Sequence, residues 1–82
     1  MDPAKELQFQ IYLDARAHQG RYLLPRRFGK RREPPDGLDL KYDACDALVS
    51  GGYAHWLSHG STFWPGLTLS GKPMADPRDA EQ

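Results

Sequence analysis

Apolar and polar residues alternate in the stretch "LQFQIYL" (residues 7–13), which taken alone is typical of a half-buried strand. The residues at either end favour a helix instead. Asp2 can accept hydrogen bonds from the free amides of a helix start, and Pro3 suits the first helical position. Gly20 stands where a left-handed residue would end the helix. We therefore predict a helix from about Pro3 to about Gln19.

The apolar positions of this helix fall into two stripes. Leu7, Ile11 and Ala15 form one, and Phe9, Leu13 and Ala17 form the other. One face of a small domain needs only one stripe against its core, so the second must be covered by another segment or by a second chain. We therefore predict a homodimer with Phe9 and Leu13 in the interface.

A second amphipathic helix is predicted after "EPPDG", whose two prolines and one glycine exclude a continuous helix. Asp39 is a plausible cap before "LKYDACDALVS", and Gly51 is a plausible stop. The predicted apolar side carries Leu40, Ala44, Ala47 and Leu48, with Cys45 and Val49 beside them. The opposite side carries Lys41, Asp43, Asp46 and Ser50.

A β-hairpin is predicted beyond Gly51 and Gly52, where "YAHWL" and "FWPGLTL" flank "SHGST" as a loop of about five residues. Pro65 cannot donate to a strand ladder, so its strand is expected at an edge of the sheet or bulged. We expect "SGKPMA" to form one turn that returns to the core. The sequence thus predicts one small domain over residues 1–75 and a disordered tail over residues 76–82.

This order of elements predicts an α+β fold and resembles the C-terminal half of winged-helix domains, which many small transcriptional regulators use. "DALVSGGYAHW" resembles the end of a recognition helix and the turn into a first wing strand. "GLTLSGKPMA" is similar to the end of such a wing. The resemblance implies that Leu67 anchors the strand, Thr68 caps a following helix and Gly71 allows close packing. It covers roughly residues 39–75.

The sequence departs from this family at two points. A complete winged helix has a further helix before the recognition helix, where this chain has "RYLLPRRFGKRREPPDG" with room for a turn or two at most. Base readout from a recognition helix normally uses Arg, Lys, Asn or Gln. Here the exposed face offers Asp43 and Asp46, which would repel phosphates. The usual recognition surface is therefore not expected to read bases.

Positive charge is concentrated in one segment of a chain whose net charge is zero. Residues 21–32 carry six positive charges and no acid, whereas residues 33–82 carry a net charge of −5. We predict a small nucleic-acid-binding accessory or regulatory protein that grips the phosphates of DNA without reading sequence. The predicted contacts are Arg21, Arg26, Arg27, Lys30, Arg31 and Arg32. The competing interpretation is a solvated loop whose arginines pair with the acidic C-terminal half.

A protein-interaction adaptor on the same scaffold is the alternative function. Its predicted contact surface consists of Phe9, Leu13, Trp56 and Trp64. Most of the aromatic cluster formed by Trp56, Phe63 and Trp64 is expected in the core, because a small domain needs its large rings there. One exposed tryptophan would serve instead as a contact for a partner.

We expect no enzyme, metal site or cofactor. Four residues of strand and turn would separate His55 from His59 by roughly 13 Å, too far to share a metal. Cys45 is expected to be a small core residue and not a nucleophile. A single cysteine, the start "MDPAKELQ" and the lack of a long apolar run predict a cytoplasmic protein outside the membrane.

Overall fold

The first helix, α1 (Pro3–Ala17), begins where the sequence predicts. The Asp2 carboxylate accepts a hydrogen bond from the Ala4 amide at 2.9 Å. The helix ends two residues earlier than expected, because Gln19 and Gly20 both adopt left-handed backbone angles, with φ of 62° and 82°. The Gly20 amide then donates to the Ala15 carbonyl at 2.7 Å, and the chain turns directly into a strand.

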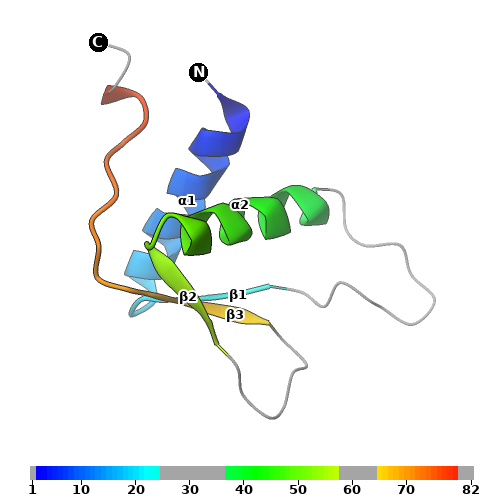
Figure 1. Cartoon of the computed structure of the whole chain (residues 1–82), viewed down its shortest axis with the longest axis vertical. Coiled ribbons are helices and arrows are strands. Elements are labelled where there is room, and N and C mark those ends of the chain that lie inside the picture. The colour runs from blue at the N-terminus through cyan, green and yellow to red at the C-terminus, as the bar shows by residue number, and fades with distance from the viewer. Residues whose placement is uncertain (1, 25–36, 58–64, 80–82) are drawn as a thin grey trace, which may run out of the picture.

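The computed structural model describes residues 2–24, 37–57 and 65–79, and has an α+β arrangement of two helices and a three-stranded antiparallel sheet (Figure 1). The elements after α1 are β1 (Arg21–Leu23), α2 (Leu38–Ser50), β2 (Ala54–Leu57) and β3 (Gly66–Leu69). The predicted α+β class and the C-terminal hairpin are confirmed. The strand β1 was not predicted, and the place of a further helix within residues 25–36 lies outside the described residues.

Helix α2 begins one residue before its expected cap. Gly37 precedes it in a left-handed conformation (φ 81°), and Asp39 lies in the first turn, where its charge suits the positive end of the helix. The predicted cap is therefore wrong. The prediction that Leu40 faces the core is also wrong, since this residue is 63 % exposed. The core-facing side is set by Leu38 and Tyr42, and at 3.6 residues per turn Leu40 points away from both.

The sheet has the strand order β1–β3–β2, with β3 antiparallel to both neighbours. The hairpin of β2 and β3 is confirmed, but the expectation for Pro65 is wrong, because β3 is the central strand. Pro65 lies just before its first residue, where no amide is needed, and its carbonyl accepts the Leu24 amide at 2.9 Å. Trp64 and the predicted loop "SHGST" lie outside the described residues.

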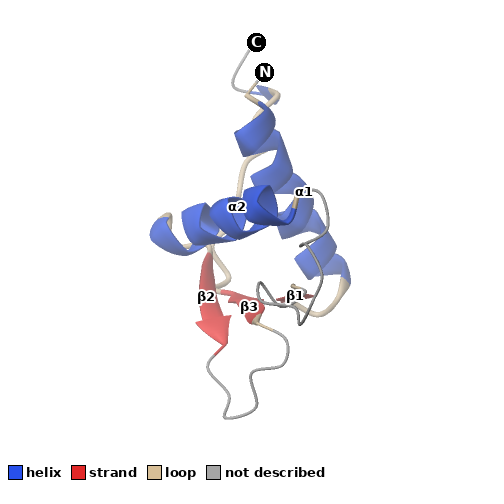
Figure 2. Cartoon of the chain, turned by 90° about the vertical axis from the view of Figure 1, so that its right-hand side faces the viewer, coloured by secondary structure: helices blue, strands red, loops and turns tan. Residues whose placement is uncertain are grey.

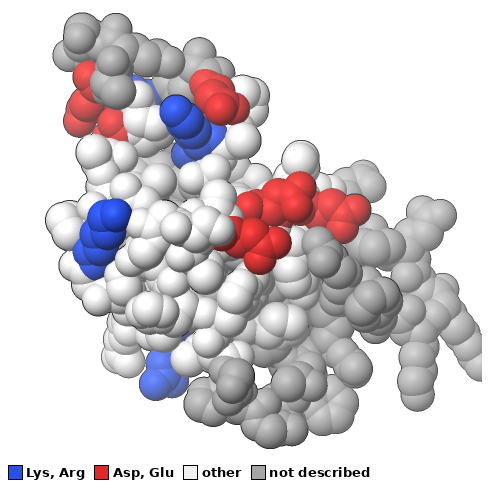
Figure 3. Space-filling model, in the orientation of Figure 1, with Lys and Arg blue, Asp and Glu red and all other residues white. Residues whose placement is uncertain are grey.

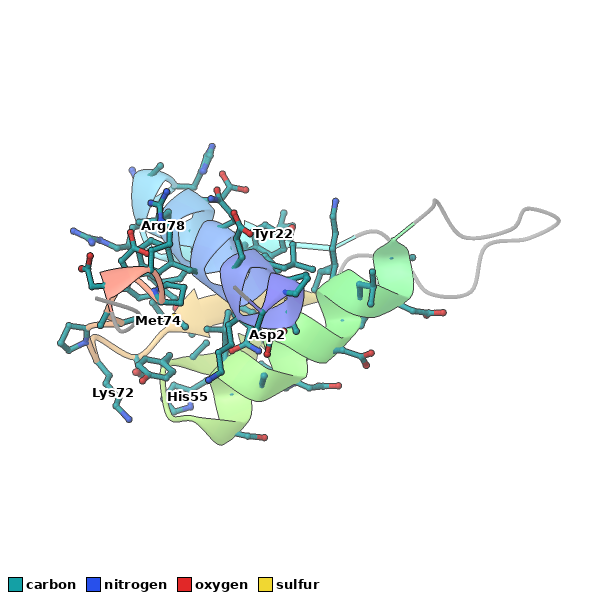
Figure 4. The ribbon with its side chains drawn as sticks, turned by 90° about the horizontal axis from the view of Figure 1, so that it is seen from above. Asp2, Tyr22, His55, Lys72, Met74 and Arg78 are labelled. Atoms are coloured by element: carbon teal, nitrogen blue, oxygen red, sulfur yellow. The ribbon has the colours of Figure 1, made fainter. Side chains whose placement is uncertain are left out.

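Both helices lie on one face of the sheet (Figures 1 and 2), and the view from above shows them crossing over it (Figure 4). The core between these layers consists of Ile11, Tyr12, Ala15, Leu24, Leu38, Tyr42, Ala44, Cys45, Leu48, Ala54 and Leu67. No helix of the described chain has the length and apolar character needed to cross a membrane.

The segment after β3 is fastened to the C-terminal end of α2. The Ser70 hydroxyl donates to the Gly52 carbonyl at 2.6 Å, and the Lys72 ammonium donates to the Gly51 carbonyl at 2.8 Å. The same ammonium lies 4.5 Å from the centre of the Tyr53 ring, within the range of a cation–π contact. Lys72 and Met74 are labelled in Figure 4. Met74 packs against the core, as expected of a segment that returns to it.

Two roles implied by the winged-helix resemblance are corrected here. Thr68 lies inside β3, and the described residues after it form no α-helix for it to cap. Gly71 has open space around its missing side chain, so its positive φ of 95° explains the glycine and close packing does not. Asp76 and Arg78 form a bidentate ion pair within a turn at Asp76–Asp79, and residues 80–82 lie outside the described chain.

Candidate nucleic-acid interface

Alternation along the strands gives the sheet two different faces. Tyr22, Leu67 and Trp56 pair across the three strands and face the helices. The next residue of each strand points to the opposite face. Arg21, Thr68 and His55 therefore form one row there, and Leu23, Gly66 and Leu57 form a second row. We call the surface made by these two rows the outer sheet face.

Gly66 leaves room for both leucines of the second row to lie over the central strand. A Cβ atom at Gly66 would lie 2.9 Å from the Leu23 Cδ2 atom and 3.2 Å from the Leu57 Cδ1 atom. Any larger residue would have to push at least one of these side chains away. The outer sheet face thus combines a polar row with an apolar band, and Leu23 remains 64 % exposed.

The basic segment leaves the sheet at the same end as the hairpin loop. Leu23 at the end of β1 and Leu57 at the end of β2 both pair with Gly66 at the start of β3. The hydrogen bond from the Leu24 amide to the Pro65 carbonyl extends this pairing by one step. Residues 25–32 and the loop of the hairpin therefore both start from this end of the sheet.

Of the predicted phosphate contacts, the structure describes only Arg21. It is exposed at the start of β1, in the row that also contains Thr68 and His55. Arg26, Arg27, Lys30, Arg31 and Arg32 lie outside the described residues. Sequence reasoning missed Thr68 and His55, because their place beside Arg21 depends on β1. The alternation of side chains over "RYL" is the signal that could have predicted this strand, but three residues are too few to establish a period of two.

The described strands contain no acidic residue. The described acidic residues lie on α1, on α2, at the helix start or in the C-terminal turn. Asp39, Asp43 and Asp46 are exposed on α2, and Figure 3 shows acidic side chains gathered over that helix. The strands carry Arg21 and His55 and no carboxylate. The two helices together carry five acids against three cations, Lys5, Arg16 and Lys41, so the helix layer is net negative and the strands are net positive.

The predicted protein-contact residues have mixed surroundings. Phe9 is half-buried and stacks on Tyr12 with 6.1 Å between ring centres. Trp56 is half-buried and stacks on Tyr42 at 6.3 Å. Leu13 is 38 % exposed, beside an open groove of about 460 Å³. Because Phe9 packs on the core of its own chain, it gives less reason for a second chain, and the homodimer stays a prediction.

Cys45 is a core residue, as the sequence predicts. It is fully buried in α2, and burial, followed by the nearby Asp46 carboxylate, raises the pKa of its thiol from 9.0 to about 12. A thiol that stays protonated at neutral pH is a poor nucleophile. Burial likewise raises the pKa of the Tyr22 hydroxyl, with smaller contributions from Cys45 and Asp14. Within residues 2–24, 37–57 and 65–79 no group of three potential ligands converges on a metal position.

The raised pKa of Cys45 predicts a loss of stability at alkaline pH. Above pH 9.0 the thiol ionises in the unfolded chain but not in the folded protein, so rising pH favours unfolding until the folded thiol ionises at about 12. The free energy of unfolding should fall by about 1.4 kcal/mol per pH unit in this window from this group. Denaturant melts across the window should show this slope, and Cys45→Ala should lose it. Equal slopes in both proteins would contradict the prediction.

Comparison with known protein families, with characterised proteins and with solved structures finds no match to this chain.

Proposed function

We propose that this protein is a small nucleic-acid-binding accessory protein with a winged-helix-like layout, which grips phosphates through its basic segment. The order helix, strand, helix and hairpin, with the first strand paired to the last, is compatible with that layout. The observation that supports the function best is the shared end of the sheet. The basic segment and the hairpin loop both start there, so a wing and a phosphate grip can approach one duplex together.

A salt titration tests the proposal directly. If three to five cations contact phosphates, the logarithm of affinity should fall against the logarithm of salt with a slope of roughly −3 to −4. Between about 50 and 200 mM salt the affinity for a duplex should therefore fall roughly 60- to 250-fold. Fluorescence anisotropy with labelled duplexes of different sequence measures this, and the affinities should be nearly equal, because phosphates carry no base identity. Absence of binding to duplex and single strands at low salt would overturn the proposal.

An interaction adaptor is the second candidate. It is favoured by two exposed large apolar side chains, Leu13 and Leu40, each of which lines a surface groove that a partner could fill. Leu13 lines the groove of about 460 Å³ between α1, β1 and Lys41, and Leu40 lines a second groove of about 380 Å³ beside the start of α1. This candidate becomes the better one if no nucleic acid binds.

A further inference from the structure

We infer that the outer sheet face docks on the phosphodiester backbone of the nucleic acid, with α2 on the side away from it. This inference rests on the proposed nucleic-acid binding and names the surface that performs it. Winged-helix proteins that insert a helix into the major groove need a recognition helix compatible with DNA. Here the exposed face of α2 that carries Asp39, Asp43 and Asp46 is acidic, whereas the described strands carry Arg21 and no acid.

The charges decide against α2 as the docking element. Asp39, Asp43 and Asp46 follow one another at spacings of four and three, so they share one exposed side of the helix. A duplex carries one negative charge per about 1.7 Å of its axis, so this side of α2 would be repelled along its length. Lys41 is the only cation of α2, and it lies on the opposite side of the helix, where it lines a groove with Asp14 and Tyr22.

The outer sheet face presents donors in a line. Residues directly opposite on antiparallel strands lie about 5 Å apart, so Arg21, Thr68 and His55 extend over about 10 Å across the sheet. Guanidinium, hydroxyl and imidazole groups can all donate to phosphate oxygens. Asp14 lines the same surface depression as Arg21, and its carboxylate lies 3.1 Å from the His18 ring.

Continuity with the basic segment completes the argument. The chain runs from Arg21 along β1 and enters the segment that carries Arg26 and Arg27 at Leu24. The band of Leu23 and Leu57 lies between the polar row and that end of the sheet. A phosphodiester backbone lying on the outer sheet face would therefore pass from the polar row, over the apolar band, to the point where the chain enters the basic segment. No described helix covers this path (Figures 1 and 2).

Charge-changing substitutions on the strands and on α2 distinguish docking through the outer sheet face from docking through α2. Arg21→Glu and His55→Glu should each weaken binding to a 20-base-pair duplex about three- to tenfold, because each adds repulsion at a phosphate contact. Lys41→Glu makes the same charge change as Arg21→Glu but on α2, and it should change affinity less than about twofold. Thermal melts of the three variants confirm that each is folded. A single strand of the same length, titrated in parallel, shows whether the backbone must belong to a duplex.

Amide chemical shifts provide a second readout that needs no substitution. Adding duplex to the labelled wild-type protein should move the amides of Arg21, His55 and Thr68 most, and those of Asp39–Asp46 least. The inference is overturned if Lys41→Glu costs as much as Arg21→Glu and His55→Glu, or if the largest shifts lie on α2. If the wild type binds but α2 carries the contacts in this way, the proposed nucleic-acid binding still stands and only the docking surface is wrong. Absence of any binding to duplex or single strands would overturn both, in favour of a protein partner.

Discussion

Replacing Leu48 with alanine is expected to lower the free energy of unfolding by about 2–4 kcal/mol. Leu48 is fully buried in α2, where it packs within the core that joins both helices to the sheet. The substitution removes apolar contacts and leaves a cavity that a small domain cannot fill without shifting its elements. Against a total of roughly 4–8 kcal/mol for a chain of this length, most of the stability would be lost.

Leu40→Ala is the matched control for this experiment, since it makes the same chemical change on the same helix. Leu40 is 63 % exposed, so its truncation should change stability by no more than about 0.5 kcal/mol. Alanine also favours the helix slightly. Denaturant titrations of both variants measure the difference. If both variants lose the same stability, or if Leu48→Ala loses none, the assignment of the core-facing side of α2 is wrong.

Replacing Arg26, Arg27, Arg31 and Arg32 together with glutamine is expected to abolish most nucleic-acid binding. Each lost phosphate contact removes about one released counterion. The slope of log affinity against log salt should therefore flatten from roughly −3 to −4 to between about −1 and 0. The loss should be nearly equal for all duplex sequences, because phosphates carry no base identity. Folding should persist, since the described core residues belong to other segments. Affinity and slope are measured by anisotropy, and folding by circular dichroism.

The same four positions changed to lysine form the control, because lysine keeps the charge and loses only the planar fork of arginine. This variant should keep most of the affinity and nearly the full salt slope. Should the glutamine variant still bind as tightly as the wild type, the phosphate grip must lie on another surface. In that case substitutions at Arg21 and His55 would be the next to examine.

The start of α1 was accessible to sequence reasoning because it depends on neighbouring residues. Asp2 and Pro3 start α1 through contacts within its own first turn, and Gly20 helps to end it. The burial of Tyr12 and Tyr42 was not accessible in this way. A tyrosine has an apolar ring and a polar hydroxyl, so pattern reasoning that counts it as polar places it on the wrong side.

The strand β1 illustrates the limit of local patterns. Three residues give no measurable period, and β1 exists because Arg21, Tyr22 and Leu23 pair with Thr68, Leu67 and Gly66 more than forty positions away. That pairing makes β3 the central strand, which removes the edge expected for Pro65. It also brings Arg21 into line with His55, and so creates the candidate interface. Pairing between segments far apart in sequence depends on the whole fold, and no short pattern predicts it.

The sequence by itself determined the α+β class, both helices, the hairpin, the buried Cys45 and the segregation of charge, because each follows from residue type or local spacing. The tertiary structure alone decided which way those elements face. It turned Leu40 outward and placed Leu24 in the core. It also put both helices on one side of the sheet and left Arg21, Thr68 and His55 on the other. The physical reason is that burial is shared among segments, so the exposure of a side chain depends on the element that packs against it.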